Sequence, residues 1–201
     1  YWCFGNDWVS IGIFTACIIF PVSILLDGSL TKIERDRIFV IYIIAFFVIF
    51  FWAAYEQAGA SLTLFAAEQT DRTIFGWEMP ASWIQSFNPF FVVILAAIMP
   101  SVWGALNKRG MEPASPTKQA IGLLLLSLGY LVICFGVKDV QPGVKVSLIW
   151  LTGLYFIHTM GEIALSPIGL SMVNKLTPVR FASLMMGIWY LSTSTANKFA
   201  G

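Results

Sequence analysis

The sequence has 201 residues, of which 58% are hydrophobic and only 11% are charged, and its net charge is +1. In soluble domains roughly a quarter of the residues are charged, so this composition excludes an ordinary soluble globular protein. The small net charge provides no basic field of the kind that attracts nucleic acid, so we expect no nucleic-acid partner.

Six apolar runs follow one another, each close to the length of about 20 residues that a helix needs to cross a bilayer. They are 8–26, 38–55, 83–107, 119–137, 146–174 and 181–197. The runs do not alternate apolar and polar residues, as the strands of a membrane barrel would. The sequence therefore predicts an all-α integral membrane protein with about six transmembrane helices, crossing the cell membrane several times.

Positive charge is distributed unequally between the loops. Eight Lys and Arg residues lie in 27–37, 107–118 and 174–181, against four in the loops on the other side and at the C-terminal end. The positive-inside rule places the first set in the cytoplasm. The chain opens on Tyr1 without an initiator Met or a signal sequence, so we expect a segment of a longer protein.

The three cysteines, Cys3, Cys17 and Cys134, show no paired or metal-type spacing. We interpret them as packing residues and expect no metal site. Motifs of metallohydrolases, serine hydrolases, phosphate loops and dinucleotide-binding enzymes are absent, as are the filter repeats of channels. The sequence does not predict an enzyme.

In the second run, Glu56 follows 18 uncharged residues. An ionisable residue inside a spanning helix costs at least about 2.5–3.5 kcal/mol on insertion scales, so it is usually paired and usually functional. Trp52 lies four residues earlier, on the same helix face. Two interpretations stay open: a structural hydrogen bond or ion pair, or a carboxylate that binds and releases a proton.

The third run contributes an amide pair at i, i+3 spacing, Gln85 and Asn88, followed by Pro89, which is expected to weaken a helical turn. The last run contributes Trp189 and Tyr190. These two aromatic residues could serve packing or the membrane interface as well as ligand binding.

The fifth run holds the second acid at membrane depth. His158, Glu162 and Ser166 recur every four residues, so all three can face one cavity. Pro167 is expected to kink the helix there, as in transporter helices that expose backbone carbonyls near the midplane. A structural kink beside a satisfied Glu162 remains an alternative. For His158 we favour a hydrogen-bonded packing role, because no second His or Cys lies at metal-ligand spacing.

Four stretches resemble the C-terminal half of the proton-dependent oligopeptide transporter family, which belongs to the major facilitator superfamily. They are Phe51-Trp-Ala-Ala-Tyr-Glu-Gln57, Gln85-Ser-Phe-Asn-Pro-Phe-Phe91, Gly161-Glu-Ile-Ala-Leu-Ser-Pro-Ile-Gly-Leu-Ser171 and Met186-Gly-Ile-Trp-Tyr-Leu-Ser192. The resemblance covers residues 38–201, as the family's helices seven to eleven. It implies that residues 1–37 hold a helix of an insertion between the two halves, with a cytoplasmic linker.

The resemblance also implies roles for individual residues. Glu56 matches a carboxylate that is protonated during transport, and Trp52 matches the aromatic residue one turn before it. Asn88 and Glu162 match the groups that hold the peptide's free amino terminus, with Ser166 beside them. Aromatic residues lining side-chain pockets are matched by Trp189 and Tyr190.

The function implied by this resemblance is proton-coupled symport of di- and tripeptides by alternating access. The proton would be the coupling ion, without a further cofactor. The partners would be the peptide, membrane lipid and a missing N-terminal half, and the segment alone is expected not to transport. Two alternatives remain: a major facilitator carrier for another solute, such as a drug or a peptide-like metabolite, and a non-transporting membrane scaffold subunit.

Overall fold

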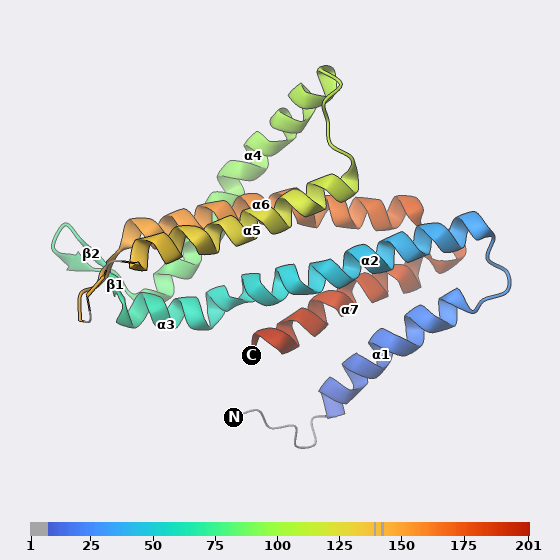
Figure 1. Ribbon diagram of the computed structural model, residues 1–201, viewed down its shortest axis with the longest axis horizontal. Coiled ribbons are helices and arrows are strands. Elements are labelled where there is room, and N and C mark those ends of the chain that lie inside the picture. The colour runs from blue at the N-terminus through green and yellow to red at the C-terminus, as the bar shows by residue number, and fades with distance from the viewer. Residues whose placement is uncertain (1–7, 139, 142) are drawn as a thin grey trace. The chain divides into compact units, whose positions relative to one another are not determined.

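The computed structural model describes residues 8–138, 140–141 and 143–201 (Figure 1). The packing role predicted for Cys3 lies outside these residues. In the described part, seven α-helices carry most of the chain. They are α1 (Trp8–Leu25), α2 (Lys32–Tyr55), α3 (Ser61–Glu68), α4 (Phe87–Lys108), α5 (Ser115–Val137), α6 (Leu148–Leu176) and α7 (Ala182–Ala200). Three 3₁₀ helices lie between them: η1 (Glu56–Gly59), η2 (Ala81–Ser86) and η3 (Val179–Phe181).

Each predicted apolar run forms a helix, which confirms the all-α membrane fold. Five helical segments are long and apolar enough to span a bilayer, over 8–25, 32–68, 81–108, 115–137 and 148–176. Helix α7 has 19 residues but is less apolar, because its second half contains Ser192-Thr-Ser-Thr195 and Lys198. It is the sixth predicted helix, and it does not belong to the five most apolar segments.

The charged segment at 32–37 is helical, which corrects the prediction that it is a linker. The Thr31 amide donates to Glu34 Oε2 at 2.9 Å, and the Glu34 amide donates to Thr31 Oγ1 at 3.3 Å. This reciprocal pair is a capping box, which satisfies amide groups that a helix start leaves without intrahelical partners. Helix α2 therefore begins at Lys32, six residues before its apolar run.

The chain between the second and third apolar runs contains further short elements. Helix α2 ends at Tyr55, and η1 and α3 carry the chain to Glu68. Four two-residue strands follow in the connections: β1 (Thr70–Asp71), β2 (Thr73–Ile74), β3 (Trp77–Glu78) and β4 (Val146–Ser147). Strands β1 and β4 pair in parallel, whereas β2 and β3 form an antiparallel hairpin.

The chain forms two compact units. The first unit comprises the described residues up to Ala53 together with Gly169–Gly201, and the second comprises Ala54–Ile168. This division differs from the predicted one between 1–37 and 38–201. The origin of the first helix as an insertion stays a prediction.

In the first unit, α1 packs on α7. The Cys17 thiol lies 3.0 Å from Thr195 Oγ1, and the Phe14 and Phe199 rings lie 5.8 Å apart. Cys17 is thus a packing residue as predicted, whereas Cys134, in the second unit, is exposed. Helix α1 also exposes large apolar side chains, Trp8 and Ile18 among them, as a lipid-facing helix does.

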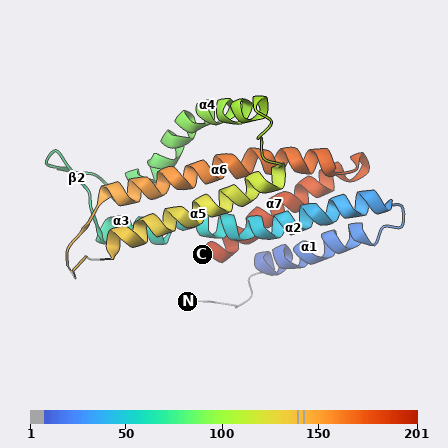
Figure 2. The same cartoon turned by 45° about the horizontal axis from the view of Figure 1, so that its top comes forward.

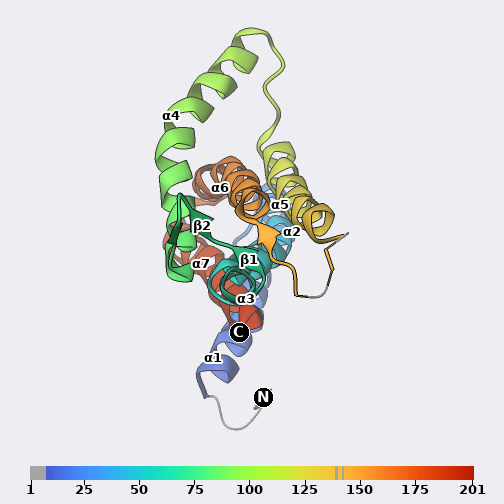
Figure 3. The same cartoon turned by 90° about the vertical axis from the view of Figure 1, so that its left-hand side faces the viewer.

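In the second unit, α5 and α6 run side by side (Figure 2 and Figure 3). Gly129 on α5 lets the His158 ring of α6 approach closely, since a Cβ at Gly129 would overlap that ring. Gln119 Nε2 donates to the Leu165 carbonyl at 2.9 Å, two residues before Pro167. Small residues at a contact between membrane helices allow such close packing.

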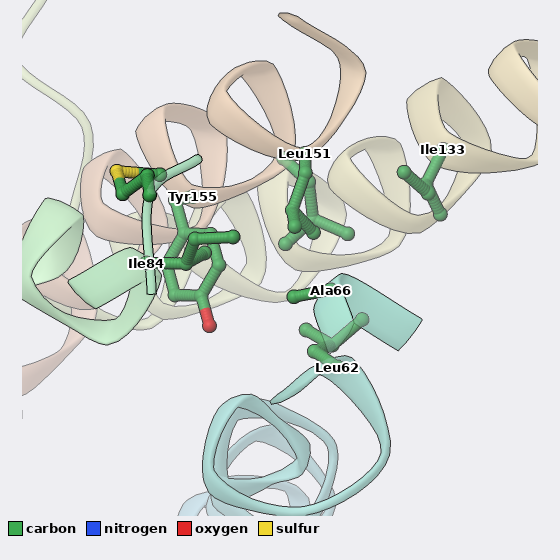
Figure 4. Close-up of a cluster of buried hydrophobic side chains, with 8 residues drawn as sticks. Leu62, Ala66, Ile84, Ile133, Leu151 and Tyr155 are labelled. Atoms are coloured by element: carbon green, nitrogen blue, oxygen red, sulfur yellow. The ribbon is translucent and has the colours of Figure 1, made fainter. Parts of the chain in front are cut away.

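A buried apolar cluster joins α3, η2, α5 and α6 in this unit (Figure 4). Its residues are Leu62, Ala66, Met79, Ile84, Ile133, Leu151, Leu154 and Tyr155. The cluster fixes η2, and through it the start of α4, against α6.

The two predicted kink prolines differ in position. Pro167 lies inside α6, which continues through it to Leu176. Pro89 lies in the first turn of α4, where the missing amide breaks no helical hydrogen bond. The kink predicted at Pro89 is therefore the junction between η2 and α4. The interior proline of α4 is Pro100, and Figure 2 shows that α4 bends along its length.

Candidate functional site

A cavity lies at the end of α2 in the second unit. The cavity has a volume of about 190 Å³. Its lining residues are Tyr55, Glu56, Ala58, Gly59, Gln85, Asn88, Tyr155 and His158. Because η1 replaces the regular helix from Glu56 onward, this acid lies at a helix break rather than inside a continuous helix. Its side chain is exposed.

A hydrogen-bonded network adjoins the cavity and includes the second acid. Glu162 Oε2 accepts hydrogen bonds from the Tyr55 hydroxyl and, at 2.9 Å, from Asn88 Nδ2. Asn88 Nδ2 is also within reach of the Tyr55 hydroxyl oxygen and lies 3.2 Å from Thr159 Oγ1. Glu162 does not line the cavity itself, but two lining residues hold its carboxylate.

Each member of this network is positioned by its own element. Tyr55 is the last residue of α2, and Asn88 lies in the first turn of α4. Thr159 and Glu162 lie one turn apart on α6, and the Thr159 hydroxyl donates to the Tyr155 carbonyl at 2.7 Å. Side chains from the ends of two helices thus meet the middle of a third.

His158 forms the wall behind the network. It is 3% exposed, and its Nε2 donates to the Leu126 carbonyl at 3.0 Å, since a carbonyl oxygen can only accept. The ring lies 4.8 Å from that of Tyr130 and 6.1 Å from that of Tyr55, between centroids. The predicted role of His158 as a hydrogen-bonded packing residue is confirmed, although it also lines the cavity.

Neither acid of the site has a cationic partner among the residues with described positions. The ion pairs found there join Arg72 to Glu78, Lys118 to Glu112 and Arg180 to Glu34. Glu162 is half-buried and receives only neutral donors. The site therefore presents negative charge that its own described surroundings do not balance.

The other residues predicted for the site are divided between the two units. Ser166 lies one turn after Glu162 on α6, half-buried, and its hydroxyl forms no hydrogen bond with the rest of the described chain. Trp52, Trp189 and Tyr190 belong to the first unit. Trp189 is 5% exposed, whereas Tyr190 is 57% exposed. The structure thus places Glu56 and Asn88 in the lining of one cavity, and Asn88 holds the Glu162 carboxylate beside it.

Two members of the network, Tyr55 and Thr159, were not predicted. Thr159 lies three residues before Glu162, so helical spacing could have suggested a shared face. Tyr55 directly precedes Glu56, and neighbours in a helix do not share a face, so no periodicity indicated it. No group of three or more His, Cys, Asp or Glu side chains within the described ranges could hold a metal ion.

Comparison with known proteins identifies the family of this chain. The family model described as the POT family matches residues 10–201. The chain belongs to the POT family. The match includes α1 as well as the helices that carry the site.

Individual POT proteins are similar over most of the chain. The peptide transporter YePEPT of Yersinia enterocolitica is 37% identical over 176 residues, which is 87% of this chain and 34% of that protein. Dipeptide and tripeptide permease A of Escherichia coli is 33% identical over 167 residues, which is 83% of this chain and 33% of the permease. The chain therefore spans about a third of the length of these relatives.

A solved structure shows the same fold. The crystal structure of a mutant of the peptide transporter POT in complex with alafosfalin superposes with a TM-score of 0.85 at 36% identity. The superposition covers 96% of this chain and 39% of that transporter. The chain is thus part of a multi-pass membrane transporter fold, and the family contains transporters rather than enzymes.

Proposed function

We propose that this chain forms part of a proton-coupled symporter of di- and tripeptides that works by alternating access in the cell membrane. The observation that carries the proposal is the Glu162 carboxylate, held by Asn88 and Tyr55 beside the cavity. Membership of the POT family supports it, as do relatives named as a peptide transporter and as a dipeptide and tripeptide permease.

In this proposal, Glu162 and its neighbours bind the peptide's amino terminus. Both hydrogen bonds to Glu162 end on Oε2, and Oε1 accepts none from the described residues. An ammonium group has three donors and a positive charge, so it can bond Glu162 Oε1 and the side-chain carbonyl of Asn88. A charge in a partly desolvated site needs such a counter-charge. We therefore assign Glu162 and Asn88 to the substrate's free amine.

In this proposal, Glu56 carries the coupling proton. Glu56 lines the same cavity from the helix break and has no cationic partner in the described chain. In the proposal, Glu56 takes up the proton and thereby loses its attraction to a cation of the missing N-terminal half. That half would also bind the peptide carboxylate, so this chain alone does not transport. The remaining assigned residues, Trp52, Ser166, Trp189 and Tyr190, would contact the rest of the substrate.

The proton role is tested by Glu56→Gln in the full-length transporter, reconstituted into liposomes. Uptake driven by a proton gradient should fall at least about tenfold, whereas peptide exchange without a gradient should persist. Glu68→Gln is the matched control, because Glu68 is an exposed acid of α3 outside the cavity. Gradient-driven uptake that survives in Glu56→Gln would show that another group carries the proton.

The substrate is tested by competition in the same liposomes. Dipeptides and tripeptides should block uptake of a labelled dipeptide, and N-acetylated peptides should compete at least about tenfold less well, since they lack the charge that Glu162 binds. A failure of all peptides to compete would favour another solute. Binding without any transport by the full-length protein would favour a scaffold.

A further inference from the structure

We infer that the Tyr55 hydroxyl is a positioning group for the substrate's amine: it orients the Glu162 carboxylate and the Asn88 amide so that each presents one free acceptor atom to the ammonium. The inference rests on the proposed function, because it adds a residue to the same amine site. Nothing in the sequence pattern assigned Tyr55 a role.

The hydrogen-bond geometry leads to this assignment. The Tyr55 hydroxyl donates to Glu162 Oε2, and its oxygen accepts from Asn88 Nδ2. A hydroxyl has one donor and two acceptor lone pairs, so both contacts can form at once. Tyr55 thereby sets which oxygen of Glu162 is occupied and which way the Asn88 amide faces.

The acceptors around Asn88 exceed its donors. Asn88 Nδ2 carries two hydrogens, but Tyr55, Thr159 and Glu162 all offer acceptor atoms within 3.2 Å. Because all three acceptors lie on the nitrogen side, the amide nitrogen is held inward, which leaves the Asn88 carbonyl oxygen as the atom available to a donor. An ammonium group supplies such a donor, whereas the acetylated nitrogen of a blocked peptide has a single, uncharged N–H.

Tyr55 is well held for such a role. It ends α2, and η1 follows directly, so its backbone lies at the junction of two helix types. Its ring lies 6.1 Å from the His158 ring, and His158 is in turn bonded to the Leu126 carbonyl. A polar group fixed by packing on rigid helices can keep its partners in a productive orientation before the substrate arrives.

The expected consequence is a loss of selectivity rather than of turnover. In Tyr55→Phe the aromatic ring remains, but Glu162 Oε2 loses one of its two hydrogen-bond donors. The Glu162 carboxylate is then free to rotate. Because hydrogen bonds to charged groups are among the stronger ones, the preference for a free amine over an N-acetylated one should fall about tenfold. The change should appear in KM, since the hydroxyl acts on substrate binding.

The experiment uses the full-length transporter in liposomes with two substrates, Ala-Ala and N-acetyl-Ala-Ala. The ratio of their kcat/KM values is measured in the parent protein, in Tyr55→Phe and in Tyr130→Phe. Tyr130 is the matched control, because its hydroxyl also donates to the end of α2, to the Ala54 carbonyl at a distance of 2.6 Å. Tyr130 does not line the cavity. Tyr130→Phe should keep the parent ratio.

The outcomes separate this inference from the proposed function. A parent transporter that takes up both substrates equally would overturn the amine site itself. A parent that discriminates, with Tyr55→Phe unchanged, would overturn only the role of Tyr55. Equal losses in Tyr55→Phe and Tyr130→Phe would reduce that role to general packing and overturn it as well.

A double-mutant cycle with Asn88→Ala gives a second test that tolerates a moderate loss of stability. If Tyr55 acts through Asn88 and Glu162, its removal should change the substrate ratio much less in Asn88→Ala than in the parent. Additive effects of the two substitutions would contradict the inference. If Tyr55→Phe transports too slowly, the ratio of the dissociation constants of Ala-Ala and N-acetyl-Ala-Ala, measured on purified protein, gives the same comparison.

Discussion

The two units of the chain share an apolar exterior but differ inside. In the first unit, the interhelical polar contacts within the apolar runs are uncharged, such as Cys17 to Thr195 and the Tyr42 hydroxyl to the Pro21 carbonyl at 3.4 Å. In the second unit, Glu162 lies half-buried among hydroxyl and amide groups. Ionisable groups at membrane depth are costly, which is why we propose that the second unit holds the proton and amine sites.

This contrast separates packing from chemistry within one fold. The first unit keeps its charges at helix ends, where Arg180 bonds Glu34 at 2.9 Å. In the second unit, the buried His158 ring packs tightly against Gly129 and bonds the Leu126 carbonyl, so it forms a rigid surface behind the network that holds Glu162. Matched substitutions in the two units should therefore differ in a predictable order.

The largest difference is expected between two glycine substitutions. A Cβ at Gly129 would overlap the His158 ring, whereas one at Gly187 on α7 meets nothing within 4 Å. Gly129→Ala should destabilise the full-length transporter by about 2–3 kcal/mol through overpacking. Gly187→Ala should be neutral or stabilise it by up to about 1 kcal/mol, because alanine favours helix. Thermal unfolding in detergent measures both, and equal shifts would show that the α5–α6 contact is not tight.

The next difference concerns two ion pairs. Lys118 Nζ lies 2.5 Å from Glu112 Oε1 and 4.7 Å from the Trp103 ring centroid, with its side chain 10% exposed. Glu112→Gln leaves that charge poorly compensated and should cost about 2 kcal/mol of stability.

The control for this pair lies in the first unit. Glu34→Gln breaks an ion pair whose Arg180 side chain is 45% exposed, so water can solvate the arginine. Its effect on thermal unfolding should be smaller and should shrink further at high salt. A larger loss for Glu34→Gln than for Glu112→Gln would reverse the comparison.

A smaller difference is expected between two buried threonines. Thr159 and Thr195 each donate to the carbonyl four residues earlier, at 2.7 and 2.8 Å. Only Thr159 also accepts from Asn88, at 3.2 Å. Thr159→Val should lower the free energy of unfolding by about 1 kcal/mol and weaken the affinity for a free-amine dipeptide. Thr195→Val should leave that affinity unchanged. Binding measured by calorimetry tests this, and an equal loss of affinity in both variants would argue against the network.

The smallest effect concerns two carboxylates outside the spanning segments, one in each unit. Hydrogen bonds from the Thr73 amide and hydroxyl lower the pKa of Asp71, and bonds from the Ser29 hydroxyl and amide lower the pKa of Asp27. A lowered pKa in the folded state means that the stabilisation is present at neutral pH and is lost as the pH falls through the folded pKa.

Local opening at 27–29 and 71–73 should therefore increase under acidic conditions. Hydrogen exchange of these segments, corrected for intrinsic rates, should show reduced protection at pH 3 relative to pH 7. Asp71→Asn and Asp27→Asn should each remove the pH dependence at its own segment only. Unchanged dependence in these variants would assign it to other groups.

Several site residues could be predicted from single positions. Glu56, Asn88 and Glu162 were predicted as polar groups that interrupt or follow apolar runs. In the structure, Glu56 and Asn88 line one cavity, and Asn88 bonds Glu162 beside it. Tyr55 did not stand out, because a tyrosine in an aromatic run carries no signal of its partners. Its contact with Glu162 joins residues 107 positions apart, which periodicity along one helix cannot report.

The sequence alone determined the spanning helices and singled out the two acids that interrupt or follow their apolar runs. In lipid, a helix satisfies its backbone hydrogen bonds within itself, so an apolar run of sufficient length suffices to define it. Only the tertiary structure decided that α2 gives way to a 3₁₀ turn at Glu56, and that Tyr55, Asn88 and Glu162 meet. Those outcomes depend on packing between distant helices, where the position of each side chain is set by neighbours that the local sequence does not contain.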